Sequence, residues 1–169
     1  MKKLCLCVAL MLMLTGCGQP EDFETMADSY EEPQAVPAEQ IWVLLPEEAA
    51  VHTAGVEGAQ LYLCDGYTLE LQILPAGDMQ ATLRSVTGYG SDRLTVMGRR
   101  QGELDRYECV WVAAGEGGEQ VGRTAILDDG HYHYVLTLMT DAGSAKELTA
   151  TWQGILDSFD LGEPELQKS

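Results

Sequence analysis

Apolar and polar side chains alternate strictly between residues 67 and 74 of the chain. The apolar positions fall on one face: Tyr67, Leu69, Leu71 and Ile73. A period of two predicts a β-strand with one buried face and one face partly in contact with water. Another apolar segment covers residues 59–64, and Asp65-Gly66 separates the two segments. Because an Asp-Gly pair can adopt the positive φ angles of a two-residue turn, the pattern predicts a β-hairpin.

Four more apolar segments follow, each bounded by turn-forming residues. They span residues 93–100, 104–114, 120–127 and 131–140. Short connections containing Gly favour neighbouring antiparallel strands, so these segments predict a four-strand meander. Residues 107–112 are largely apolar on both faces, which predicts a central strand covered on both sides. Residues 41–45, ended by Pro46, predict a short opening strand.

A helical period appears between the hairpin and the meander. Met79, Leu83 and Val86 recur at i, i+4 and i+7, which places them on one face of a helix. Asp78 stands where a side chain can cap a helix N-terminus, and Gly88 stands where a helix can end. The pattern predicts a short helix between these two residues.

The clearest helical pattern lies near the C-terminus. One apolar stripe follows a spacing of three and four residues: Ala145, Leu148, Trp152, Ile155, Leu156 and Phe159. Ser144 and Glu147 have the spacing of a capping box, in which each side chain bonds the backbone of the other. The sequence therefore predicts a helix that begins at Ser144 and docks its apolar stripe on the sheet.

The order of these elements predicts the fold class. Strands, a short helix, four more strands and a C-terminal helix are typical of an α+β domain. We expect an antiparallel sheet of about six to seven strands covered by helices, with the last helix C-terminal. The length suits a single domain over residues 41–161, followed by a polar tail over residues 162–169.

Part of this pattern resembles a known family. The segment GRTAILDDGHYHY, residues 122–134, and the helix from Trp152 to Phe159 resemble small bacterial lipoproteins of the PsbP-like and DcrB-like sandwich superfamily. The resemblance spans most of residues 41–161 and rests on pattern and topology. It implies a three-layer α-β-α sandwich, usually non-enzymatic, whose relatives serve as accessory or binding subunits. It carries no functional motif onto numbered positions.

The N-terminus has the features of a bacterial lipoprotein signal. Lys2 and Lys3 precede an apolar run that ends in a lipobox, Leu14-Thr15-Gly16-Cys17. The run is shorter than the roughly 20 residues that a membrane-spanning helix needs. We therefore predict that residues 1–16 are a cleaved signal peptide and that Cys17 carries lipid. This modification would anchor the chain on the extracytoplasmic face of the cell membrane. A plain secretory signal with a coincidental cysteine is the alternative.

The mature chain is strongly acidic. The full sequence has a formal charge of −17, and removal of residues 1–16 leaves eight basic against 27 acidic residues, or −19. Nucleic acids and anionic lipid head groups attract the opposite sign of charge, so neither is an expected ligand. Residues 18–40 contain seven acidic residues, no Lys or Arg, and three prolines. With Cys17 they predict an acidic, disordered tether over residues 17–40.

Recognisable catalytic motifs are absent from the sequence. It contains no Gly-x-Ser-x-Gly, no His-Glu-x-x-His and no Gly-x-x-x-x-Gly-Lys segment. We therefore expect a protein that is not an enzyme and that uses no cofactor.

His131 and His133 form the one pair with metal-ligand character, because residues i and i+2 of a strand share a face. Asp128 and Asp129 lie just upstream. A catalytic zinc site needs about three protein ligands, whereas Asp near Gly also favours a turn. We favour a half-exposed strand without a metal. A small metal-dependent enzyme or metal-handling protein that uses the two histidines is the alternative.

Cys64 and Cys109 are the thiols that remain once Cys17 is acylated. Export makes a disulfide between them possible, but Cys is also common in strands as a small buried apolar residue, and we favour this reduced form. Arg99, Arg100 and Arg123 stand out in an acidic chain, and we expect them to form surface ion pairs.

Together these features predict a lipid-anchored binding or scaffold protein of the bacterial cell envelope. Its expected partners are the membrane, through the lipid, and an envelope protein or ligand that the sequence does not identify. A transporter's solute receptor is disfavoured, because such receptors usually need two lobes and one domain supplies one.

Overall fold

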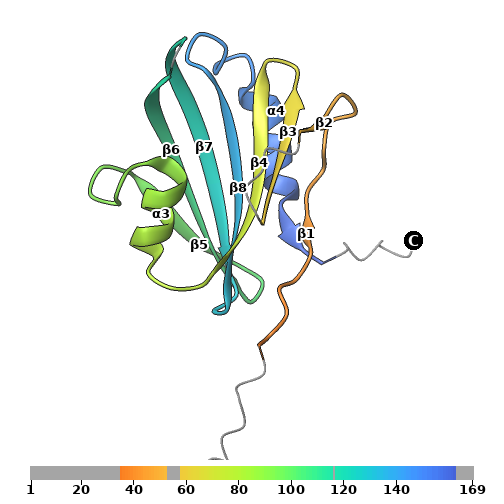
Figure 1. The fold of residues 1–169 in the computed structure, drawn as a ribbon, viewed down its shortest axis with the longest axis vertical. Coiled ribbons are helices and arrows are strands. Elements are labelled where there is room, and N and C mark those ends of the chain that lie inside the picture. The colour runs from red at the N-terminus through yellow and green to blue at the C-terminus, as the bar shows by residue number, and fades with distance from the viewer. Residues whose placement is uncertain (1–34, 53–57, 116, 163–169) are drawn as a thin grey trace, which may run out of the picture. The chain divides into compact units, whose positions relative to one another are not determined.

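Seven strands form one antiparallel sheet in the computed structural model, which describes residues 35–52, 58–115 and 117–162 (Figure 1). All of these except residues 35 and 36 belong to one compact unit, residues 37–169. In spatial order the strands are β2 (Ala50–His52), β3 (Ala59–Cys64), β4 (Tyr67–Pro75), β8 (Tyr132–Asp141), β7 (Gly118–Asp128), β6 (Leu104–Gly115) and β5 (Val96–Gln101).

The local strand predictions are confirmed. β3 pairs with β4 as a hairpin, and Gly66 in its turn has a φ of 77°. β5, β6, β7 and β8 pair consecutively as the expected antiparallel meander. On β4 the alternation has the expected result, since Leu69 is fully buried while Glu70 is only partly covered.

Two helices cover opposite faces of this sheet (Figure 1). α3 (Met79–Thr87) packs its Leu83 with Ile126 of β7 and Val135 of β8. α4 (Thr149–Ser158) packs with the alternate residues of those strands, including Leu127 and Leu136. Because successive side chains of a strand point to opposite faces, the result is a three-layer α-β-α arrangement with one core on each side of the sheet. The α+β fold class is confirmed.

α3 begins and ends as its sequence predicts. The Asp78 carboxylate accepts a hydrogen bond from the Gln80 amide at 3.0 Å, which satisfies one of the free amides of the first turn. Gly88 ends the helix with a φ of 79°, in the left-handed conformation that glycine adopts without strain.

α4 begins later than predicted. It starts at Thr149 with Leu148 as its N-cap, and no side chain caps it. Ser144 and Glu147 lie in preceding turns, where the Glu147 amide donates to the Ser144 carbonyl at 3.1 Å. The capping box at Ser144 was therefore wrong, because the same residues also suit consecutive turns. The apolar stripe itself is confirmed from Leu148 to Phe159.

The position predicted for β6 was also wrong. β6 is second from the edge of the sheet, and β8 is its central strand. On the α3 side, β6 buries Cys109 and Trp111. On the α4 side, Val110 and Val112 are 55% and 46% exposed. Apolar residues on both faces therefore mark an uncovered apolar surface here, not a central strand.

The opening segment forms a second, two-stranded sheet. β1 (Ile41–Trp42) pairs with β9 (Asp160–Leu161), which directly follows α4. Residues 40–45, called the strap below, cross the α4 side of the main sheet. The inward-facing strap residues Ile41, Val43 and Leu45 pack against the core on that side. Expected as one strand over residues 41–45, the segment pairs only at its first two residues.

Some predictions concern residues outside the described ranges. These are the signal peptide at residues 1–16, Cys17 and most of the tether, and the tail after residue 162. Within the described residues, no helix is long and apolar enough to cross a bilayer.

Candidate functional site

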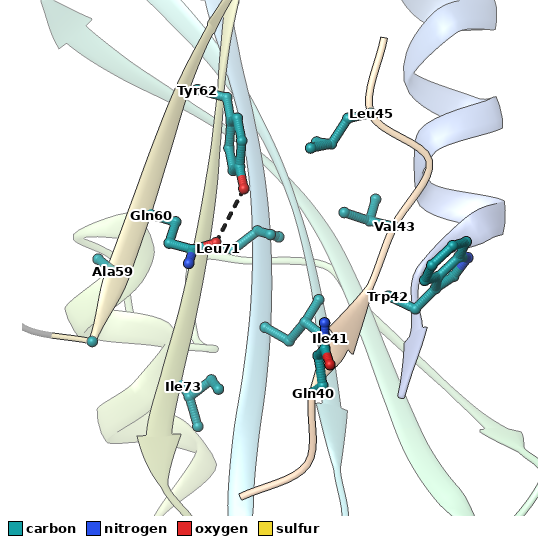
Figure 2. A pocket seen from close by; sticks show the side chains of 11 residues that line it. Gln40, Ile41, Trp42, Val43, Leu45, Ala59, Gln60, Tyr62, Leu71 and Ile73 are labelled. Atoms are coloured by element: carbon teal, nitrogen blue, oxygen red, sulfur yellow. Dashed lines mark hydrogen bonds between the residues drawn. The ribbon is translucent and has the colours of Figure 1, made fainter. Parts of the chain in front are cut away.

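A groove of about 590 Å³ lies between the strap and the hairpin formed by β3 and β4 (Figure 2). It is called the strap groove below. The strap contributes Gln40, Ile41, Trp42, Val43 and Leu45, and the other side contributes Gly58, Ala59, Gln60, Tyr62, Leu71 and Ile73. Its size falls within the range of about 300–1,000 Å³ that is common for small-molecule sites.

The apolar wall of the groove follows from alternation along the strap. Ile41, Val43 and Leu45 lie on the side that faces β3 and β4, whereas Trp42 lies on the opposite side (Figure 2). Leu44, which is also outward, is 64% exposed. The apolar run of the sequence therefore has two functions in the fold, since alternate residues form the groove wall and an exposed outer surface.

The polar groups of the groove are neutral. The Tyr62 hydroxyl donates to the Gln60 side-chain oxygen at 3.1 Å, and Gln40 adds a second amide group (Figure 2). None of the described side chains that line the groove is charged. In a chain with a formal charge of −17, such a surface suits a neutral and largely apolar occupant.

Hydrogen bonds hold the strap in place at both ends. The Glu39 amide donates to the Tyr134 hydroxyl at 2.9 Å, and the Leu44 amide donates to the Ser158 hydroxyl at 2.8 Å. The Gly162 amide donates to the Gln40 carbonyl at 2.9 Å, next to the β1–β9 pair. The groove wall is therefore tied to β8 and to the end of α4.

Asp129 completes this attachment. Its carboxylate accepts from the Tyr134 hydroxyl at 2.8 Å, from the Tyr132 amide at 2.6 Å and from the His131 amide at 2.7 Å. Burial raises the pKa of Asp129, but these hydrogen bonds and the nearby His131 outweigh it and hold that pKa below its usual value. Burial is also the main reason that the pKa of Tyr134 rises to about 12. The hydroxyl thus stays protonated at neutral pH and keeps donating to Asp129.

The two candidate metal ligands have different surroundings. His131 is exposed and precedes β8, whereas His133 is 1% exposed beneath α3. His133 Nδ1 lies 2.8 Å from the Thr82 hydroxyl, and its Nε2 lies 3.6 Å from the Asp128 carboxylate. The half-exposed face expected at His133 was wrong, because α3 covers it. Among the described residues, no group of three or more His, Cys, Asp or Glu side chains has a geometry that could hold a metal ion.

The structure keeps Cys64 and Cys109 apart, so the possible disulfide is not present in it. Cys64 packs with the α4-side core and Cys109 with the α3-side core, and both thiols are free. Three strands separate β3 from β6. Because neighbouring strands lie about 4.8 Å apart, the distance from β3 to β6 is well above the roughly 7 Å between Cα atoms that a disulfide can bridge. Burial raises the pKa of the Cys109 thiol to about 11 and also raises that of Cys64, so neither is an activated nucleophile.

The arginines form ion pairs, as expected. Arg100 pairs with Asp105 at 3.1 Å, and Arg99 and Arg123 both approach Glu108, at 3.3 and 3.6 Å. The sequence did not single out Arg106, which is 1% exposed and lies 2.8 Å from Glu108. The one sequence feature that could have pointed to it is the spacing of Arg106 and Glu108, which places both side chains on the same face of β6.

Comparisons with known proteins place the fold. No protein-family model and no curated protein matches the sequence. The solution structure of cyanobacterial PsbP (CyanoP) from Synechocystis sp. PCC 6803 is similar, with a TM-score of 0.53 and 11% identity, over 77% of this chain and 96% of that one. A crystal structure from Bacteroides thetaiotaomicron VPI-5482 has a TM-score of 0.50 and 13% identity, over 73% of this chain and 46% of that one.

The chain thus spans less than half of the Bacteroides protein. LpqN, described as involved in cell envelope biogenesis of Mycobacterium tuberculosis, has a TM-score of 0.46 and 9% identity, over 84% of this chain and 97% of that one. At 11% identity the likeness to CyanoP concerns the fold, and it confirms a PsbP-like α+β architecture.

Proposed function

We propose that this protein is a lipid-anchored binding protein of a bacterial cell envelope, and that the strap groove holds a neutral, largely apolar ligand. The observation that carries the proposal is a groove of about 590 Å³ whose described lining residues are all uncharged, in a chain with a formal charge of −17. A neutral, apolar ligand gains free energy when its surface leaves water and enters this groove, and it has no ionic hydration to lose. Binding without catalysis is the function that this chemistry supports.

The place of action is inferred from the N-terminal sequence. The lipobox ending at Cys17 supports a lipid anchor on the extracytoplasmic side of the membrane. A random-coil tether that ends before Glu39, whose amide is bound to Tyr134, would hold the domain on the order of 25 Å from the lipid. The strap directly follows this tether in the sequence.

Ligand chemistry is the first test of the groove. The mature chain carrying Cys17→Ser should bind the neutral apolar dye N-phenyl-1-naphthylamine, with a rise in dye fluorescence. Dodecanol should displace the dye more effectively than dodecanoate, because none of the described residues that line the groove offers a cation to the carboxylate. Val43→Phe should reduce dye affinity by about tenfold, since Val43 points into the groove and the ring fills part of it.

A matched control places the same aromatic ring outside the groove. Leu44→Phe, at an exposed position on the outer side of the strap, should leave dye affinity unchanged. Equal loss in both variants, or stronger displacement by dodecanoate, would contradict the proposal. Circular dichroism of each variant distinguishes a blocked groove from a lost fold.

Lipid attachment is tested at the N-terminus. Cys17→Ser should move the protein out of the membrane fraction or leave its signal uncleaved, because stable anchoring needs two or more acyl chains. Cys7→Ser, within the apolar run, should have no such effect. Mass spectrometry of the wild-type protein should find a lipidated Cys17 at the N-terminus. A mature N-terminus at another residue, or one without lipid, refutes the anchor.

A further inference from the structure

A second groove lies on the α4 side of the sheet, where β5, β6 and β7 extend beyond the cover of that helix. A hollow of about 340 Å³, lined in part by Met97, Val110, Val121 and Lys146, adjoins one of about 250 Å³ that shares Met97 and Glu108 with it. Together they are called the arginine groove below. Its described lining residues are all different from those of the strap groove, and it does not depend on the proposed function.

The floor of the arginine groove is apolar and exposed. Met97 is 60% exposed and Val110 is 55% exposed, and Val112 on the same face of β6 is 46% exposed. Val112 stands opposite Val121 of β7, so the apolar surface continues across three strands. The surface is open because α4 begins only at Thr149 and its buried side chains pack with β4, β7 and β8.

The rim of the groove is rich in basic residues, although the chain as a whole is strongly acidic. Arg99, Arg123 and Lys146 are three of the seven Lys and Arg residues in the described ranges, and they line the groove together with two carboxylates. One of these, Glu108, is already engaged by three arginines, including the buried Arg106 at 2.8 Å. Among the described lining residues three cations face two carboxylates, so the lining carries a positive charge in a chain of charge −17.

From this combination we infer that the arginine groove binds an acidic segment of a partner protein, in which carboxylates flank apolar side chains. The apolar residues would cover Met97 and Val110, and the carboxylates would meet Arg99, Arg123 and Lys146. Charge complementarity favours this occupant, because opposite charges across an interface raise the association rate and exclude other partners. An anionic membrane is disfavoured by the strongly acidic remainder of the chain.

The test uses the mature chain carrying Cys17→Ser and a labelled peptide of alternating Glu and Val. This peptide should bind, and a matched peptide of alternating Lys and Val should not, although the net charge of the chain favours the opposite order. Lys146→Glu should weaken binding by about fivefold, since it reverses a rim charge. Arg93→Glu makes the same change of net charge at an exposed position that lines neither hollow and should have less than about a twofold effect.

The apolar floor has its own matched pair. Val110→Ser should weaken the Glu-Val peptide by about fivefold, because roughly half of a valine side chain becomes buried on binding. Val51→Ser, at a 65% exposed position on β2, should have no effect. Preference for the Lys-Val peptide, or equal effects of Lys146→Glu and Arg93→Glu, overturns the inference.

Two other occupants give distinct outcomes. Stronger association with phosphatidylglycerol vesicles than with the Glu-Val peptide would assign the groove to a membrane and overturn the inference. Self-association in analytical ultracentrifugation that Lys146→Glu abolishes would assign it to a second copy of the chain and would also overturn it. A monomer that binds the acidic peptide and ignores the vesicles supports it.

Discussion

Arg106→Met is expected to lower the free energy of unfolding by about 3–5 kcal/mol, because it removes one partner of a buried charge network. The Arg106 guanidinium donates to the Leu156 carbonyl at 2.7 Å and to the Phe159 carbonyl at 3.1 Å. Both carbonyls lie at the end of α4, where helical acceptors run out of i+4 donors; the Leu156 carbonyl also accepts from the Phe159 amide at 3.2 Å. The same side chain lies 2.8 Å from Glu108 and stacks over Phe159.

Urea unfolding of the mature chain carrying Cys17→Ser measures this effect. Arg100→Met is the control, since the Arg100–Asp105 pair is exposed at 64% and 46% and should contribute no more than about 1 kcal/mol. Equal destabilisation by Arg106→Met and Arg100→Met would show that Arg106 does not stabilise the end of α4.

The elements that could be predicted from the sequence are those with local causes. Asp65-Gly66 determines the hairpin, and Asp78 and Gly88 determine the limits of α3. In each case a few neighbouring residues satisfy the backbone groups of the element they bound. The apolar stripe of α4 was equally clear, because its period needs no knowledge of the partner.

The predictions that failed depend on distant residues. The place of β6 in the sheet depends on which strands flank it, and Tyr107 to Val112 contain no such information. Ser144 and Glu147 suit a capping box or a turn, and packing of the later residues decides between them. The strap groove exists because β1 pairs with β9, at the opposite end of the domain. The apolar run at residues 41–45 predicts that these residues are buried, but it does not predict that a groove remains between them and the β3–β4 hairpin.

The Arg–Glu network shows the same limit for charges. Alternation places Arg106 and Glu108 on one face of β6, together with Leu104 and Val110. A charged residue at such a position is normally expected to lie in water. Its burial becomes favourable only because the end of α4 brings carbonyl acceptors to it. The docking of a helix against a strand far from it in sequence therefore determines the role of Arg106.

The docking of α4 itself is tested at Trp152, and Trp152→Ala should cost about 3–5 kcal/mol of unfolding free energy. Trp152 is 3% exposed and makes an edge contact with Tyr67, with ring centroids 6.1 Å apart. Its indole Nε1 has no hydrogen-bond partner among the described residues, so truncation mainly removes packing. Trp152→Phe, which keeps an aromatic ring, should cost much less.

Trp42→Ala is the matched control, because the same side chain on the strap is 39% exposed and faces away from the strap groove. We expect it to change the free energy of unfolding by less than about 1 kcal/mol. The difference in unfolding free energy between the two tryptophan variants measures the effect of burying Trp152 between α4 and the sheet, since the same atoms are removed in both. If Trp152→Ala leaves the urea midpoint unchanged, α4 does not pack on the sheet in solution, and the α4-side core and the arginine groove beside it lose their structural basis.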